Sequence, residues 1–315
     1  MARILGYTHP ACLDHDNGPG HAECAERLEA VLEAVHEAFP RLEWIEAPRA
    51  TRGQLLRVHD PALLDLVLGT RPHKPIPLDC DTMLSPGSAE AALRAVGAGV
   101  AATEAVLHGE ADVAFCAVRP PGHHATGDTA MGFCLFDNVA VAAAHALDKF
   151  GLARVAIVDF DVHHGNGTQA IFERDPRVLY LSSHQAPLYP WTGAANERGA
   201  GNVVNVPLPA GTGGERFRQA WREQLLPALD AFAPQLLFIS AGFDADHRDP
   251  LAQLALAPAD FAWLTAELCA LAGRHAGGRV VSMLEGGYDL QALREGSVAH
   301  VSVLAGEAAQ ARAAP

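Results

Sequence analysis

The sequence predicts an α/β fold in which a central, mainly parallel sheet lies between two layers of helices. Short runs of apolar, often β-branched residues alternate along the chain with longer segments whose apolar residues recur at helical spacing. Most of the short runs are almost continuously apolar, which is typical of strands that are buried on both faces. Of the 315 residues, 49% are hydrophobic and 19% are charged, so the chain is able to bury a large core.

The predicted elements follow from their local signals. The first helix carries an apolar stripe from Leu28 to Phe39 and stops at Pro40. Asp60 and Pro61 predict another helix start, with Asp60 as N-cap and Pro61 at the first helical position. The predicted strands cover residues 4–7, 42–46, 113–118, 155–160, 178–182, 203–206, 236–240 and 280–284. The predicted helices cover residues 23–39, 88–107, 138–150, 215–232, 258–275 and 290–304.

Composition limits the class of protein. We expect one domain over residues 1–306 and a fraying Ala-rich tail over 307–315. The 23 Lys and Arg against 37 Asp and Glu give a net charge of −14, which argues against a nucleic-acid partner. The apolar runs are too short for a signal-peptide core or a membrane span, so we expect a cytoplasmic protein without a membrane partner. The six cysteines form no C-x-x-C pair and are expected to be reduced.

Titratable residues follow four of the predicted strands. These strand ends carry residues 119–124, 159–166, 242–244 and 285–288. Because ligands of open parallel sheets bind beyond the carboxyl ends of the strands, we expect the four segments to form one site.

The most informative segment is D-x-D-x-H-H-G-N-G, which begins at Asp159. Asp159, Asp161 and His163 alternate at strand spacing and are therefore expected to project to one side. Asp161, His163 and Asp244 together form three protein ligands with a fourth position open for water, which is the arrangement of a catalytic metal. These ligands suit Zn²⁺, Fe²⁺, Co²⁺ or Mn²⁺.

Two further features indicate amide hydrolysis. Hydrolysis needs a base for the attacking water and an acid for the departing amine, and the adjacent His123 and His124 are able to cover both duties. Tyr288 follows two glycines and offers a phenol donor for a developing oxyanion.

At this point the chain resembles the zinc-dependent histone deacetylase superfamily, in particular its class II and its bacterial histone deacetylase-like and acetylpolyamine amidohydrolase branch. The resemblance spans nearly the whole chain and rests on a series of motifs in order. These are H-A-E-C-A-E-R-L from His21, S-P-G-S from Ser85, R-P-P-G-H-H-A from Arg119, M-G-F-C from Met131, D-x-D-x-H-H-G-N-G, S-A-G-F-D from Ser240 and E-G-G-Y from Glu285.

The resemblance implies the arginase/deacetylase fold, with one eight-stranded parallel sheet, and Zn²⁺ held by Asp161, His163 and Asp244. It implies that Asp159 orients a charged His123. Asn166 occupies the position that orients His124, where it should leave His124 less basic than a carboxylate would. His124 is then the general base and acid. A structural monovalent cation, commonly K⁺, is implied beside Asp159, Asp161, His163 and Ser182.

The resemblance also implies a narrow tunnel for the substrate stem. Its walls would be Gly132, Phe133 and Tyr189, the last in place of the usual Phe. Arg27 matches the arginine that lines the family's internal channel for released acetate. For Asp81 we consider a role on the rim, against the commoner case of a loop aspartate that caps its own turn. Trp191 either lines the entrance or packs against the surface, and the sequence leaves both open.

The resemblance leaves the substrate open between two amides. Leu251 stands where polyamine-selective relatives of the eukaryotic type carry a gatekeeper glutamate, which favours acetyl-lysine in peptides or proteins, or another small acylated amine. The alternative is an acetylpolyamine deacetylase, which the net charge of −14 would also suit. A catalytically inactive protein that binds acyl ligands is a remote alternative. A two-manganese ureohydrolase would need a second set of Asp and His ligands, which we do not find in this sequence. The oligomeric state stays open.

Overall fold

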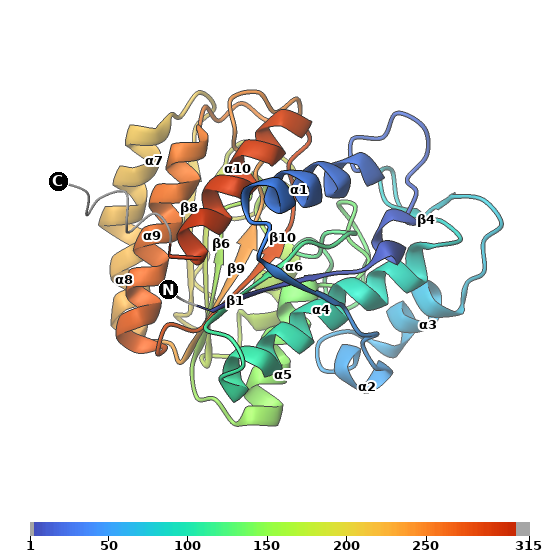
Figure 1. Ribbon diagram of the computed structural model, residues 1–315, viewed down its shortest axis with the longest axis horizontal. Helices are drawn as coiled ribbons and strands as arrows, with labels where there is room; N and C mark the ends of the chain where they lie inside the picture. Colours follow the sequence, from blue (N-terminus) through green and yellow to red (C-terminus); the bar gives the residue numbers. More distant parts are fainter. Residues whose placement is uncertain (1–2, 307–315) are drawn as a thin grey trace.

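The computed structural model describes residues 3–306 and contains an eight-stranded sheet between two layers of helices (Figure 1). The strand order is β2-β1-β5-β10-β9-β6-β7-β8, and every neighbouring pair is parallel. The strands are β1 (Ile4–Thr8), β2 (Glu43–Glu46), β5 (Val113–Cys116), β6 (Val155–Asp159), β7 (Val178–Gln185), β8 (Val203–Leu208), β9 (Leu236–Ala241) and β10 (Val280–Leu284). The predicted three-layer α/β fold is confirmed. The predicted tail, 307–315, lies outside the described residues.

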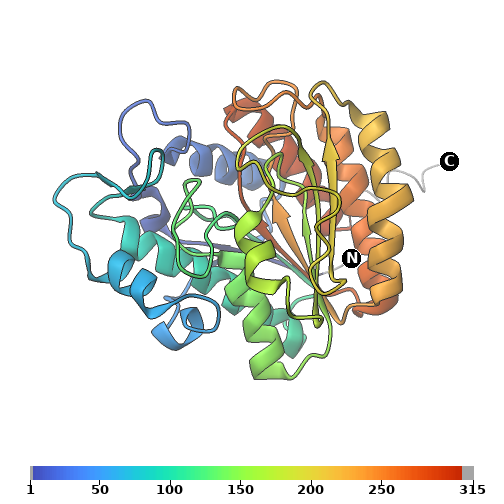
Figure 2. The ribbon, with the colours of Figure 1, turned by 180° about the vertical axis from the view of Figure 1, so that it is seen from behind.

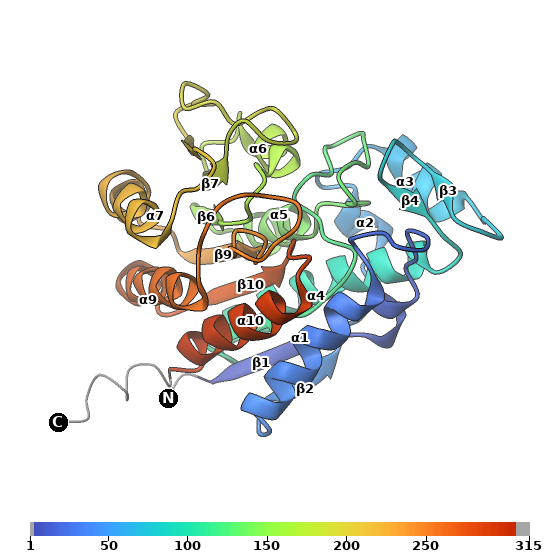
Figure 3. The ribbon, with the colours of Figure 1, turned by 90° about the horizontal axis from the view of Figure 1, so that it is seen from above.

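The helices cover both faces of this sheet. They are α1 (Ala25–Ala38), α2 (Arg52–Leu55), α3 (Pro61–Gly69), α4 (Ser88–His108), α5 (Asn138–Phe150), α6 (Asn166–Phe172), α7 (Gly214–Ala220), α8 (Leu226–Phe232), α9 (Pro258–His275) and α10 (Leu290–Leu304), with short turns η1 (Pro10–Leu13) and η2 (Trp221–Leu225). Helices α1, α10 and α9 pack in sequence on one face (Figure 3). Helices α4, α5 and α6 cover the other, as the view from behind shows (Figure 2).

Helix ends agree with their capping signals. Asp137 accepts a hydrogen bond from the Ala140 N–H at the start of α5 (2.8 Å), and Asp289 accepts one from Ala292 at the start of α10 (2.7 Å). Helix α3 begins at Pro61 as predicted, although Asp60 makes no side-chain capping bond. These caps satisfy backbone donors that would otherwise have no partner.

Several elements differ from the sequence prediction. The segment predicted as one helix over 215–232 consists of α7, the π-helical turn η2 and α8, which follow one another without a break. The connection over residues 70–88 contains a two-stranded antiparallel sheet of β3 (Ile76–Pro77) and β4 (Met83–Leu84). Helix α6 was not predicted, because a seven-residue helix shows too little apolar periodicity to be recognised. All six cysteines are free, as expected.

The core beneath α10 contains a histidine that makes folding stability depend on pH. His300 packs edge-on against Phe115, Phe160 and Phe243, while its two ring nitrogens hydrogen-bond Thr265 Oγ1 (2.6 Å) and Ser282 Oγ (2.8 Å). Burial lowers the pKa of His300 to about 3. The unfolded chain takes up this proton below about pH 6.5 and the folded chain does not. Stability from this group is therefore complete above pH 6.5 and falls as the solution is acidified.

We expect His300→Phe to remove this contribution to the acid sensitivity. The free energy of unfolding in urea should be measured between pH 7 and pH 5 for both proteins. Below about pH 6 the wild-type value should fall faster than that of the variant, by about 1.4 kcal/mol per pH unit, because only the wild-type unfolded state protonates at this position. The variant loses two hydrogen bonds and starts lower at pH 7, so the slope is the informative quantity. Parallel curves would contradict the assignment.

Candidate active site

Four neighbouring strands carry the candidate site. Strands β5, β10, β9 and β6 lie side by side in the sheet, and the segments that follow their carboxyl ends are residues 119–124, 285–288, 242–244 and 159–166 (Figure 3). The four predicted strand ends therefore meet at one edge of the sheet. Two of these neighbours, β5 and β10, are more than 160 residues apart in the chain, so only the topology brings their loops together.

Three buried side chains form a candidate metal centre at this edge. Potential ligand atoms of Asp161, His163 and Asp244 all lie within 4.8 Å of one another. His163 Nδ1 is 3.1 Å from both Asp161 Oδ1 and Asp244 Oδ2. The three predicted ligands thus converge on one point.

The donor set fits a divalent cation. Backbone N–H groups hold the outer oxygens of both carboxylates, since Val162 donates to Asp244 Oδ1 (2.8 Å) and Gly286 donates to Asp161 Oδ2 (2.8 Å). One oxygen of each carboxylate is left facing His163. Burial and the adjacent Asp161 carboxylate raise the pKa of Asp244 to about 7. Two buried carboxylates this close are costly without a cation, and a divalent ion would keep both deprotonated.

The geometry that orients these ligands differs from the prediction. Strand β6 ends at Asp159, so Asp161 and His163 lie in the loop after it, and the expected alternation at strand spacing was wrong. Two side-chain turns shape this loop. The Asp161 N–H donates to Asp159 Oδ1 (3.1 Å), and the His163 N–H donates to Asp161 Oδ1 (2.9 Å). Asp159 Oδ2 instead faces His123.

The adjacent histidines have different partners and opposite electrostatics. His123 Nδ1 donates to Asp159 Oδ2 (3.0 Å), and His124 Nδ1 donates to Asn166 Oδ1 (2.8 Å). Burial lowers the pKa of His123, but the carboxylates of Asp161 and Asp159 outweigh burial and hold this pKa well above its usual value. Burial and the neighbouring His123 charge hold the pKa of His124 well below its usual value. The pair therefore combines a charged imidazolium with a neutral imidazole.

Tyr288 faces this centre from the loop after β10. Its ring lies 5.8 Å from the ring of Phe133 at 81°, and its N–H donates to Asp249 Oδ2 (2.7 Å). Burial and the carboxylates of Asp244 and Asp161 raise the pKa of Tyr288 well above its usual value. The phenol is therefore protonated at neutral pH and able to donate a hydrogen bond.

The predicted tunnel residues fall into two groups. The Tyr189 ring lies 5.2 Å from the His124 ring, and the Phe133 ring lies against Tyr288. Gly132, with φ +56°, lies so close to the same imidazole that an added Cβ would stand 2.5 Å from it. Leu251 is 37% exposed, and its N–H donates to Asp249 Oδ1 (2.9 Å). Its backbone thus shares Asp249 with Tyr288, while its side chain reaches the surface.

Behind Tyr288 lies a buried ionic network that the sequence did not reveal. Glu23 is fully buried and pairs with Arg27 Nη1 (2.9 Å) and with both Nε and Nη2 of Arg119. Arg27 donates to the carbonyls of Gly287 (2.5 Å) and Glu285 (2.6 Å). Its guanidinium carbon lies 4.9 Å from the centre of the Tyr288 ring. The network thus holds the backbone on the amino side of Tyr288.

Glu285 is a second residue whose role the sequence missed. Its buried carboxylate accepts hydrogen bonds from the N–H groups of Gly122 (2.7 Å) and His123 (3.2 Å) and from Ser240 Oγ (3.1 Å). This one side chain therefore ties the loop of the histidines to the loop of Tyr288. The acidic residue was visible at its strand end, but its partners come from distant strands, so no local pattern identified them.

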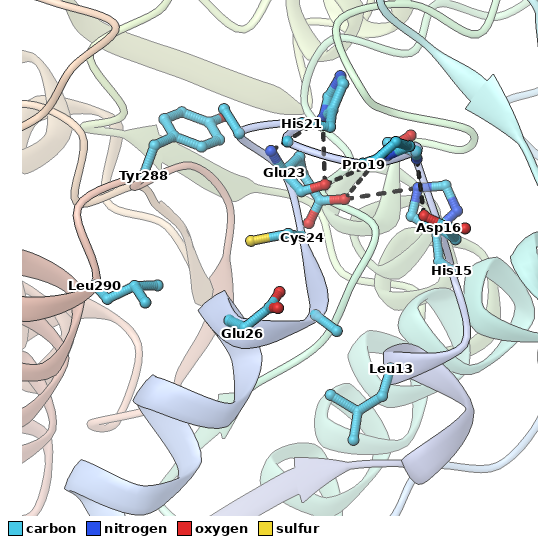
Figure 4. Close-up of a pocket in the computed structure, with 15 residues that line it drawn as sticks. Leu13, His15, Asp16, Pro19, His21, Glu23, Cys24, Glu26, Tyr288 and Leu290 are labelled. Carbon is cyan, nitrogen blue, oxygen red and sulfur yellow. Dashed lines mark hydrogen bonds and ion pairs between the residues drawn. The ribbon is translucent and has the colours of Figure 1, made fainter.

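A pocket of about 640 Å³ adjoins this network, since Glu23 lines it (Figure 4). It is lined by Leu13, residues 15–26, Tyr288 and Leu290. His21, one of the lining residues, contacts the Phe133 ring at 4.8 Å, and its Nε2 donates a hydrogen bond to the carbonyl of Asp81 (3.2 Å). The pocket therefore adjoins both Tyr288 and the residues around the tunnel mouth.

The remaining predicted residues lie in two places, Ser182 beside Asp159 in the sheet and Asp81 in the loop before β4. Ser182 pairs with Asp159 in the register of β6 and β7, and its Oγ shares a hydrogen bond with His184 Nδ1 (2.9 Å). Asp81 is half-buried beside Asp79, which together with burial raises the pKa of Asp81. Within residues 3–306, no helix combines the length and apolar character needed to cross a membrane.

Comparisons with known proteins show the family to which the chain is similar. The family model for the histone deacetylase domain matches residues 21–304. The histone deacetylase-like amidohydrolase of Pseudomonas aeruginosa is 45% identical over 277 residues, which cover 85% of this chain and 73% of that protein. A probable deacetylase of Archaeoglobus fulgidus is 39% identical over 90% of this chain and 80% of that protein. The crystal structure of the HDA15 HD domain superimposes with a TM-score of 0.92 at 37% identity, covering 98% and 90% of the two chains.

The fold and the site together define a hydrolase that acts on amides. The chain belongs to the histone deacetylase family.

Proposed function

We propose that this protein is a zinc-dependent deacetylase that removes acetyl or other small acyl groups from the ε-amino group of lysine in peptides or proteins. The observation that carries the proposal is the convergence of Asp161, His163 and Asp244 beside the differently charged His123 and His124. Bound Zn²⁺ would supply a Lewis acid that polarises the amide carbonyl and acidifies water. Fe²⁺ or Co²⁺ would suit the same donors.

The chain's own residues would move the protons. His124, held neutral and oriented by Asn166, takes a proton from the attacking water and returns it to the departing amine nitrogen. His123, charged beside Asp159, stabilises the negative charge that develops in the transition state. The Tyr288 phenol donates a hydrogen bond to the amide oxygen, on which this negative charge develops.

The other site residues would support this reaction. Gly132, Phe133 and Tyr189 enclose the acyl stem beside the histidines. We also propose a K⁺ ion beside Asp159, Asp161, His163 and Ser182, where the register of β6 and β7 supports a shared site.

We propose that released acetate leaves past Arg27. Its buried guanidinium lies 4.9 Å from the Tyr288 ring centre. Tyr288 and Glu23 both line the pocket of about 640 Å³, which supports a route from the catalytic centre to that pocket.

The second candidate substrate is an acetylated polyamine. The net charge of −14 and the acidic pair Asp79 and Asp81 favour an amide substrate that carries ammonium groups. Leu251 favours the peptide, because an apolar side chain at that position offers no partner to an ammonium group.

A paired assay distinguishes the candidates. Hydrolysis of an acetyl-lysine peptide, acetylputrescine and acetylspermidine should be compared on the Zn²⁺-loaded protein, with a chelating hydroxamate as inhibitor control. We expect the peptide to be cleaved fastest and the hydroxamate to abolish cleavage. Faster cleavage of the polyamines would favour the second candidate. No cleavage of any of these, or of longer acyl groups, would indicate a protein that only binds acyl ligands.

A further inference from the structure

Trp191 combines two unfavourable features at the mouth of the site. Its side chain is 75% exposed, and its backbone adopts the left-handed conformation with φ +67°. A residue with a Cβ rarely adopts this backbone conformation, and an indole that stays exposed to water contributes little hydrophobic free energy to folding. Packing and backbone preference therefore both leave the tryptophan unexplained, and an outlier of this kind beside an active site indicates a functional role.

Both flanks of Trp191 are fixed against the site. On one side, the Tyr189 ring lies 5.2 Å from the His124 ring and 6.4 Å from the His163 ring. On the other side, Thr192 Oγ1 shares a hydrogen bond with His164 Nδ1 (2.7 Å). The Trp191 N–H closes the turn by donating to the Leu188 carbonyl (2.9 Å). The chain on both sides of Trp191 is thus held against the site, and the indole itself is exposed beside it.

The same mouth carries negative charge. Burial is the main cause that raises the pKa of Tyr189. The nearby carboxylates of Asp81 and Asp79 raise this pKa further. The segment is fixed to the opposite wall, because Thr82 Oγ1 accepts a hydrogen bond from the Phe133 N–H (3.0 Å). Among the described residues, neither Asp79 nor Asp81 forms an ion pair with a Lys or Arg side chain. An aromatic face and two carboxylates without a Lys or Arg partner at one opening are complementary to a cation.

We propose that Trp191 determines substrate specificity by holding a second, positively charged group of the substrate against its indole face. The substrate class is then an acylated amine with a further cation near the amide, either a Lys or Arg side chain flanking acetyl-lysine or an ammonium group of an acetylated polyamine. Asp79 and Asp81 add a longer-range attraction for the same cation. This inference rests on the proposed amidohydrolase function and specifies its substrate.

The test uses substrates that differ only in charge. One pair is an acetyl-lysine peptide with arginine on both sides and the same peptide with citrulline. The other pair is acetylspermidine and a neutral N-alkyl acetamide of equal length. Trp191→Gly removes the indole and suits φ +67°, so the variant should melt at or above the wild-type temperature. Trp191→Phe keeps an aromatic face, and Leu66→Ala removes an exposed apolar side chain, 46% exposed, from α3 as a control.

We expect Trp191→Gly to lower kcat/KM for the cationic substrates by about three- to fivefold through KM, with a much smaller change for the neutral ones. Trp191→Phe should retain part of the preference, and Leu66→Ala all of it. Asp79→Asn should reduce the preference and its dependence on salt. If Trp191→Gly lowers kcat/KM more for the arginine peptide than for acetylspermidine, the cation belongs to a peptide side chain. The opposite order assigns it to a polyamine.

Three results would overturn the inference. Equal losses on charged and neutral substrates would mean a simple apolar contact, and unchanged kcat/KM would mean no contact at all. A smaller assembly of Trp191→Gly on size-exclusion chromatography would mean that the indole joins two copies of the chain. If the wild-type protein cleaves none of the substrates, the proposed function fails. Calorimetric titration of the peptide pair into wild-type and Trp191→Gly protein still measures the cation preference in that case.

Discussion

Replacing Asp244 with asparagine is expected to abolish metal binding and catalysis together. Asparagine keeps an oxygen for the Val162 N–H but removes the negative charge that faces His163. Loss of one of three ligands should reduce bound metal to below about a tenth of the wild-type amount and kcat/KM by about 10³-fold or more. Metal per chain by elemental analysis and hydrolysis of the preferred substrate check both values.

A matched aspartate controls for a general loss of negative charge. Asp230 lies on α8 and pairs with Arg274 and His275 at the surface, outside the group of candidate ligands, so Asp230→Asn should keep the full metal content and activity. An Asp244→Asn protein that retained both metal and turnover would remove Asp244 from the ligand set.

Replacing Tyr288 with phenylalanine is expected to lower kcat by about one to three orders of magnitude while metal binding stays intact. Phenylalanine preserves the ring beside Phe133 and under the Arg27 guanidinium, and it removes only the phenol hydroxyl. The lost hydrogen bond is one that forms to charge developing in the transition state, so KM should change little. Steady-state kinetics and metal analysis separate the two effects.

The corresponding control is a tyrosine outside the site. Tyr7 is buried in β1, so Tyr7→Phe removes a hydroxyl from the core without touching the catalytic centre. Unchanged turnover in Tyr288→Phe, or an equal loss in Tyr7→Phe, would contradict the role of Tyr288 as oxyanion donor.

The strands were predictable because each carries its signal locally. β10 was predicted residue for residue over 280–284, and β6 within one residue, since both are mostly apolar runs that the sheet buries on two faces. The helices α5, α9 and α10 were predicted with their observed bounds, because their apolar residues recur at helical spacing. The short α6 and the two-residue β3 and β4 escaped, because so few residues cannot establish a period.

The candidate ligands were predictable as residue types at strand ends, but their geometry was not. Asp159, Asp161 and His163 were expected to project to one side through strand-like alternation, whereas the loop after β6 orients Asp161 and His163 through hydrogen bonds from backbone N–H groups to the carboxylates of Asp159 and Asp161. Such turns depend on side-chain orientations that a spacing rule does not contain.

The amino-acid sequence by itself determined the α/β class, the alternation of buried strands with helices, and the set of polar residues that follow four strands. Those properties arise from local periodicity and from turn chemistry, which a linear chain displays directly. Only the tertiary structure decided that Glu23 joins Arg27 and Arg119, that Glu285 holds the His123 loop, and that Trp191 stands exposed at the mouth. Each of these depends on which strands become neighbours and on which side chains lose water, and both are consequences of the whole chain packing at once.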